Sequence, residues 1–214
     1  LKDAGDSDLW RLSRLRWLNS TMGVDDDVIP PFTPLVKKDN AISMVGRTVK
    51  FSPTGLLTSI KSNAREVLSA PVKFIVSESG KTAAFKPVKQ KVTKQKPGAI
   101  EETYSAQASK LGLDIETKTE ADGTITCEAT ITARKDVNLD DIRLQVPIKK
   151  SVAKYLMGFG VRGGYRKSDI KWKWDIDRQD DIVWIGEGGD GVQVRLRPHK
   201  DFWDFNFRGT GVPE

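Results

Sequence analysis

Aspartates that follow two tryptophans are the residues of this chain best placed for chemistry. Residues 171–181 read KWKWDIDRQDD, with Asp175 and Asp177 at the spacing that puts both on one face of a strand. Hydrolysis of a glycosidic bond uses two carboxyl groups roughly 5 to 9.5 Å apart, one of them with a raised pKa. Lys171 and Lys173 share the face of these aspartates, and ion pairs with them would keep both carboxylates ionised. The pattern therefore favours a salt-linked strand face over catalysis.

The tryptophans of the same stretch predict packing. Ile170, Trp172, Trp174 and Ile176 alternate, which puts four large apolar side chains on one face of a strand. A flat indole ring can also stack on a sugar ring, so a glycan platform is the alternative to a core wall. On that alternative, the side chains that would bind carbohydrate are Trp172, Trp174, Trp184, Arg162, Arg166 and Asp175.

A single cysteine and a single histidine leave few other chemistries open. Cys127 can form no internal disulfide or cysteine-based metal cage, and its alternation with Ile125 predicts a buried core position. Histidine metal sites and nucleophile–histidine pairs would all depend on His199. The segment EGGDG at 187–191 fails as a phosphate loop because a strand pattern follows it. We expect no catalytic residue, no metal and no cofactor in this chain.

Charge and composition point away from nucleic acid and from a membrane span. The 214 residues carry a formal net charge of +6, without the clustered basic patch typical of a nucleic-acid binder. No apolar run approaches the roughly 18 residues that a spanning helix needs. The lysine-rich segment 81–96 is typical of a solvated edge strand, and a polyanion-binding groove is its alternative.

The first forty residues differ in pattern from the rest. Residues 6–18 carry apolar side chains at helical spacing after a capping aspartate or serine, which predicts a helix. Pro30, Pro31 and Pro34 then predict an extended strap. We therefore divide the chain into residues 1–40, the helix and Pro-rich strap, and residues 41–214, a β-sandwich domain, within one globular unit.

Period-2 alternation predicts strands through most of residues 41–214. The clearest hairpin joins 110–120 to 123–133 through Asp122-Gly123, and a second turns at 186–191. Ile142 and Leu144 alternate in the same way and should face the core. The predicted fold class is all-β: an antiparallel two-sheet β-sandwich, with a galactose-binding or mutarotase-like supersandwich as a variant, plus one N-terminal helix.

Loops at the strand ends are where such a sandwich would meet a neighbouring domain. The residues predicted for this contact are Gly160, Gly163, Gly164, Glu187 and Asp190. A small calcium site that uses oxygens of Glu187 and Asp190 is the alternative role for the second loop.

Several segments carry a pattern that spans most of the chain. They are WRLSRLRWLNSTMGVDDDVIPPFTPL, VGRTVKFSPTGLLTSI, YLMGFGVRGGYR, WKWD and VWIGEGGDGVQVRL. In these segments the chain resembles a non-catalytic domain of large bacterial proteins related to glycoside hydrolase family 123. It departs from that pattern at EGGDG, where an Asn-Ala-Gly-like turn is usual, so no shared contact of that loop is carried over.

The resemblance implies a β-sandwich that lies before a (β/α)₈ barrel. In family 123 the barrel removes β-linked N-acetylgalactosamine with an adjacent Asp-Glu pair and the substrate's acetamido group. This chain has no Asp-Glu dipeptide, so no catalytic residue is carried over. The implied role is to support the catalytic barrel of a secreted glycan-degrading protein, in an extracellular or periplasmic location.

Two other functions stay open from the sequence. One is a stand-alone carbohydrate-binding module that uses its tryptophans, including Trp203, as stacking platforms. The other is a carboxylate-dependent glycosidase or lyase that uses Asp175 and Asp177 together with Arg162 and Arg166.

Overall fold

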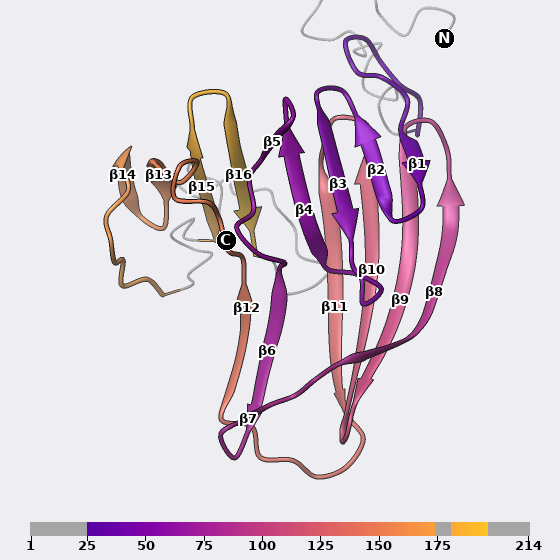
Figure 1. Ribbon diagram of the computed structural model, residues 1–214, viewed down its shortest axis with the longest axis vertical. Helices are drawn as coiled ribbons and strands as arrows, with labels where there is room; N and C mark the ends of the chain where they lie inside the picture. The colour runs from indigo at the N-terminus through magenta and orange to yellow at the C-terminus, as the bar shows by residue number, and fades with distance from the viewer. Residues whose placement is uncertain (1–24, 174–180, 197–214) are drawn as a thin grey trace, which may run out of the picture.

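The described part of the chain consists of β-structure and its connections. The computed structural model describes residues 25–173 and 181–196, and within them sixteen strands and no helix are present (Figure 1). No helix in this part is therefore long and apolar enough to cross a membrane. The strands are β1 (Val36–Lys38), β2 (Ala41–Met44), β3 (Arg47–Phe51), β4 (Leu57–Ser62), β5 (Arg65–Glu66), β6 (Lys73–Glu78), β7 (Lys81–Thr82), β8 (Lys86–Gln95), β9 (Ala99–Ala108), β10 (Leu111–Glu120), β11 (Ile125–Ala133), β12 (Asp141–Gln145), β13 (Tyr155–Gly158), β14 (Val161–Tyr165), β15 (Ile182–Glu187) and β16 (Asp190–Arg195).

These strands form four separate antiparallel sheets, so the predicted two-sheet sandwich and its supersandwich variant are wrong. The sheet orders are β1-β2-β3-β4-β5, β11-β10-β9-β8, β12-β6-β7 and β14-β13-β15-β16. Alternation shows which face of a strand is apolar, but it does not show which strands pair. Here β6 pairs with β12 rather than continuing into the sheet of β8, and β13 to β16 pair only among themselves. The helix predicted at 6–18 lies outside the described residues.

The main core lies between the sheet β1–β5 and the sheet β8–β11, which face each other in Figure 1. Phe51 of β3 and Tyr104 of β9 are fully buried and stack with their ring centroids 6.3 Å apart. Leu113 and Ile115 of β10 belong to the same core cluster. Burial of such side chains contributes roughly 1.5 to 3 kcal/mol each, which makes this interface the main source of stability.

Both predicted hairpins are confirmed. Strands β10 and β11 pair through the turn at Asp122 and Gly123, with Leu113 opposite Ile131. Strands β15 and β16 pair through a turn at residues 188–189. The lysine-rich segment also forms the predicted edge strand, because β8 ends its sheet and is exposed along almost its whole length.

Three predictions made from alternation are wrong in the described residues. Cys127 of β11 is exposed rather than buried. Ile142 and Leu144 of β12 are 54% and 40% exposed, because no described element covers that face of the edge strand β12. Residues 170–173 are not in a strand, and the rest of the strand predicted there lies outside the described residues.

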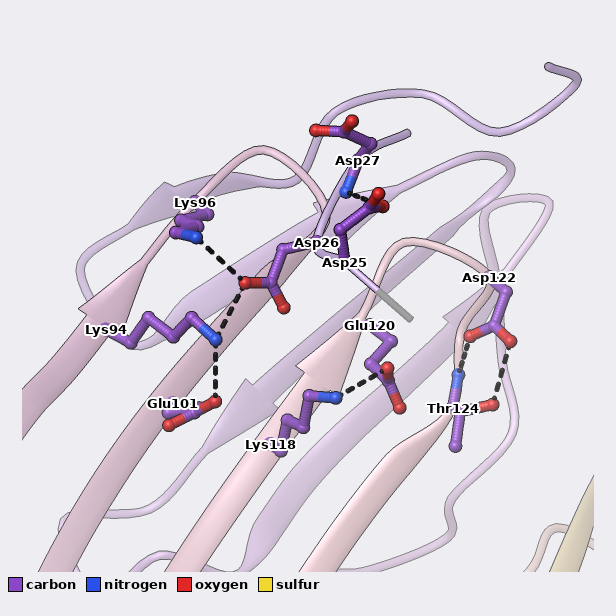
Figure 2. A network of polar contacts seen from close by, with 10 residues as sticks. All are labelled: Asp25, Asp26, Asp27, Lys94, Lys96, Glu101, Lys118, Glu120, Asp122 and Thr124. Atoms are coloured by element: carbon purple, nitrogen blue, oxygen red, sulfur yellow. Dashed lines mark hydrogen bonds and ion pairs between the residues drawn. The ribbon is translucent and has the colours of Figure 1, made fainter. Parts of the chain in front are cut away.

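Asp25, Asp26 and Asp27 form an acidic strap that is bound to one end of the sheet β8–β11. Figure 2 shows Asp26 between Lys94 and Lys96, with N–O distances of 2.7 and 3.2 Å. The hydrogen bond from Lys94 is the main reason why the pKa of Asp26 lies below its usual range. Leu35 then donates its backbone N–H to Pro97, and the chain enters β1, inside the segment predicted as helix and strap.

Candidate functional site

The small sheet β13–β16 carries the glycine- and arginine-rich run GFGVRGGYR at residues 158–166. Strand β13 pairs with β14 on one side and with β15 on the other. The β13–β14 register shifts between Leu156 and Gly158, so the strand bends there. Gly158 has φ +120°, and a Cβ at this position would lie 2.2 Å from the carbonyl oxygen of Ile182. A glycine is therefore required for β13 to bend against β15.

A pocket of about 350 Å³ is lined by residues of β13, of β14 and of the segment that follows β14. We call it the β13–β14 pocket. Its described lining consists of three apolar and four polar side chains: Leu156, Val161 and Ile170, with Arg162, Tyr165, Arg166 and Lys167. None of these residues is acidic, so the pocket combines an apolar surface with positive charge.

Tyr165 offers the most exposed ring at the pocket. It is 81% exposed and lies directly opposite Tyr155 in the β13–β14 pair. The two ring centroids are 4.9 Å apart with an interplanar angle of 37°, so Tyr155 supports the exposed ring. The hydrogen bond with Tyr165 is the main reason why the pKa of Tyr155 is raised.

Arg166 is held in place by backbone acceptors. Its Nε donates to the carbonyl oxygen of Ala153 at 2.9 Å, and its Nη1 donates to that of Lys167 at 3.1 Å. Its backbone N–H also donates to the carbonyl oxygen of Lys154. The guanidinium is thus oriented before any ligand arrives, whereas Arg162 and Lys167 are exposed on β14 and just after it.

The tryptophans predicted as sugar platforms lie elsewhere. Trp172 is half-buried and packs on Phe159 with a centroid distance of 4.3 Å, and its Nε1 is buried without a hydrogen-bond partner among the described residues. Trp184 of β15 is half-buried over Gly186 and Gly191, where added Cβ atoms would lie 2.5 and 2.9 Å from its indole ring. Neither is among the described lining of the pocket, and Trp174 and Asp175 lie outside the described residues.

The loop residues predicted to contact another domain have different surroundings. Gly160 closes the β13–β14 turn with φ +65°, Gly163 lies against Met157, and Gly164 faces open space. Glu187 instead pairs with Lys154 and with Arg65 of β5, the latter at 2.9 Å.

The second loop is therefore tied to its own chain. Arg65 also reaches Asp190 at 3.5 Å and the carbonyl oxygen of Ser151 at 2.9 Å. The hydrogen bonds from Lys154 and then Arg65 hold the pKa of Glu187 below its usual range. Two cations occupy the carboxylates that a calcium ion would need. In the described part of the chain, no group of three or more His, Cys, Asp or Glu residues is arranged to hold a metal ion.

Only one member of the aspartate cluster can be placed. Asp181 is buried and accepts a hydrogen bond from Arg195 Nε at 2.9 Å, which makes it part of the β15–β16 hairpin. Asp175, Asp177 and Asp180 lie outside the described residues, as does Trp203. The structure therefore brings together Arg162 and Arg166 from the predicted set, and it adds Tyr165 and Lys167. The clue to both was their place beside the two arginines in the run RGGYRK.

A family model described as the third domain of glycoside hydrolase 123 matches residues 35–206. The chain belongs to this family. The match covers well over half of the 214 residues and includes the four sheets and the β13–β14 pocket. The resemblance to family 123 found in the sequence is thus confirmed. No curated protein matches the chain. Because the family is described as a third domain, the chain corresponds to one domain of a glycoside hydrolase that has other domains.

Proposed function

We propose that the chain is a non-catalytic domain of a secreted glycan-degrading enzyme and supports a catalytic (β/α)₈ barrel of the same protein. The observation that carries this proposal is the match to a family described as a third domain, which implies neighbouring domains. Extracellular or periplasmic location is part of the proposal and rests on the resemblance to secreted glycan-degrading proteins.

The edges of the sheet β8–β11 indicate where the barrel would bind. Strand β8 is protected against further pairing by Pro87, by Lys86, Lys89, Lys91 and Lys94, and by two register shifts. Strand β11, at the opposite edge, runs through nine residues in regular register and contains neither proline nor lysine. An edge strand without such protection is open to pairing with another segment. We therefore place the barrel's contact along β11.

A pair of lysine substitutions tests this contact. In the full multidomain protein, Thr130→Lys with Thr132→Lys should lower the melting temperature of the barrel, because the altered edge no longer supports it. Val88→Lys with Val92→Lys, which adds the same two charges on the already protected strand β8, is the matched control and should leave the barrel unchanged. Equal effects of both variants, or no effect of either, would contradict the proposed contact.

The non-catalytic role is tested on the purified chain. It should not hydrolyse aryl β-glycosides, including the β-N-acetylgalactosaminide. Turnover that Asp175→Asn abolishes without loss of stability would overturn the non-catalytic role and establish the carboxylate-dependent alternative.

Glycan binding by the domain itself is a second candidate function. It is favoured by the exposed Tyr165 ring beside an apolar surface, a combination that suits the faces of a sugar ring. Binding of sugars to the purified chain, with loss of binding in Tyr165→Ala, would support it.

A further inference from the structure

The charge around the β13–β14 pocket is one-sided. Arg162, Arg166 and Lys167 line it, and no acidic residue is among its described lining. Within the part of the chain that the structure describes, none of the three forms an ion pair with a carboxylate, whereas Arg65, Lys94 and Lys154 all do. A cluster of cations that the protein does not neutralise attracts an anion, and it does so most strongly at low ionic strength.

The cations carry N–H donors of the kind that bind a planar or tetrahedral oxyanion. A guanidinium donates two parallel N–H bonds to a carboxylate or sulfate. Arg166 uses Nε and Nη1 on backbone carbonyl groups, so its Nη2 stays available in a fixed place. Arg162 lies on β14 and Lys167 follows this strand, which puts two exposed cations beside the fixed one.

An inorganic ion would use only part of this pocket. The exposed ring of Tyr165, supported by Tyr155, and the apolar side chains of Leu156, Val161 and Ile170 offer nothing to a bare anion. They match the C–H faces of a sugar ring. The volume of about 350 Å³ is within the range of small-ligand sites.

The geometry points to an acidic sugar as the ligand of the β13–β14 pocket: a pyranose that carries a carboxylate or a sulfate group. The anionic group binds Arg162, Arg166 and Lys167, and the ring packs on Tyr165. This inference rests on glycan binding, the second candidate function, and it is independent of the supporting role proposed for β11. It names the class of sugar that the domain selects.

Titration of the purified chain with four probes tests the inference. The probes are galacturonic acid, N-acetylgalactosamine 4-sulfate, neutral N-acetylgalactosamine and sodium sulfate, followed by amide chemical shifts. We expect the two acidic sugars to bind about tenfold more tightly than the neutral sugar, a difference of about 1.4 kcal/mol. Their binding should weaken as sodium chloride is added, because the cations are exposed. The shifts should centre on β13 and β14.

Variants separate the two parts of the pocket. Arg162→Gln should remove the preference for acidic sugars. Tyr165→Ala should weaken the binding of all sugars, whereas Tyr165→Phe should leave their binding unchanged. Lys89→Gln removes a positive charge from the remote strand β8 and should change nothing. Unchanged melting temperatures would show that the variants are folded.

Each other outcome has a definite meaning. Equal binding of neutral and acidic sugars would overturn the inference but leave glycan binding intact. Sulfate alone binding as well as the acidic sugars would show an anion site and overturn the inference. Binding of none of the probes would overturn both the inference and glycan binding, with no bearing on the contact at β11.

Discussion

Glu66 of β5 links the middle of β4 to the segment after β5 through one carboxylate. Its Oε2 accepts a hydrogen bond from Ser59 Oγ at 2.5 Å, and its Oε1 accepts backbone N–H groups of Ile60 and Leu68 at 3.0 and 3.1 Å. Burial alone would raise the pKa of this carboxyl group, but the three hydrogen bonds outweigh burial and lower the pKa. The folded state therefore stabilises the ionised form of Glu66.

Glu66→Gln should destabilise the protein by about 1 to 3 kcal/mol, because three hydrogen bonds to a charged carboxylate become weaker hydrogen bonds to a neutral amide. Urea denaturation would measure the change. Glu78→Gln is the control, since it breaks the half-buried pair with Lys110, which lies near the surface, and should cost about 0 to 1 kcal/mol.

The same carboxylate makes stability depend on pH. Because the folded pKa is lowered, its contribution is complete above the unfolded value, about 4.3, and is lost as the pH falls through the folded value. The difference in stability between wild type and Glu66→Gln should shrink over that range. A constant difference would contradict the role of the ionised form.

Cys127 lies on the exposed strand β11, yet burial around its thiol raises its pKa. Iodoacetamide should therefore label the folded protein, but with a pH midpoint above the value of about 8.5 for a free cysteine, because the thiolate is the reactive form. Mass spectrometry against the urea-unfolded chain would measure both rates. Absence of labelling in the folded chain would restore the buried position that alternation predicted.

At the scale of elements, local chemistry made the hairpins predictable. Asp122 and Gly123 suit a tight turn, and Asp122 accepts the backbone N–H of Thr124 at 2.8 Å. The lysines of β8 identified an edge strand, because lysine discourages further pairing. Both signals involve residues close in sequence, so they could be recognised without the rest of the fold.

Alternation failed where coverage of the apolar face decided the outcome. Ile142 and Leu144 do lie on β12, but they are exposed, since no described element covers that face of the strand. Trp172 does pack against another side chain, as predicted. Its partner is Phe159, however, and it lies outside any strand. Of the candidate site, Arg162 and Arg166 could be named from their place in a glycine-rich run. The role of Tyr165 could not, because it depends on the cross-strand contact with Tyr155.

Gly98 allows the acidic strap to cross the β8–β9 turn. A Cβ at this position would lie 2.2 Å from the backbone oxygen of Asp26, next to the ion pairs of Figure 2. Gly98→Ala should displace the strap and cost about 1 to 3 kcal/mol, the usual range for overpacking. Gly189→Ala, with open space around it, is the control and should be close to neutral. Equal stability of the two variants in a thermal melt would show that the strap does not press on this turn.

At the scale of the whole molecule, one arginine links two of the four sheets. Arg65 of β5 pairs with Glu187 and Asp190, which are more than a hundred positions away in the sequence. Contacts at such separation leave no local pattern, and the same is true of the pairing of β6 with β12. This is why sixteen strands could be largely anticipated while their division into four sheets could not.

The ion pairs of Arg65 predict which sheet opens first when they are removed. Arg65→Gln should raise amide exchange in β15 and β16 and leave β9 and β10 protected, because the large core does not include these contacts. Arg143→Gln, which removes an exposed pair on β12, is the control and should leave exchange in β15 and β16 unchanged.

Acid should reproduce the effect of Arg65→Gln. The lowered pKa of Glu187 keeps its pairs with Lys154 and Arg65 ionised below the ordinary carboxyl range, and they are lost as the pH falls through the lowered value. Chemical shifts of β15 and β16 should then change together at a pH where those of β9 and β10 are still constant. A single transition shared by all four strands would mean that the fourth sheet is held by more than this link, and that the molecule opens as one cooperative unit.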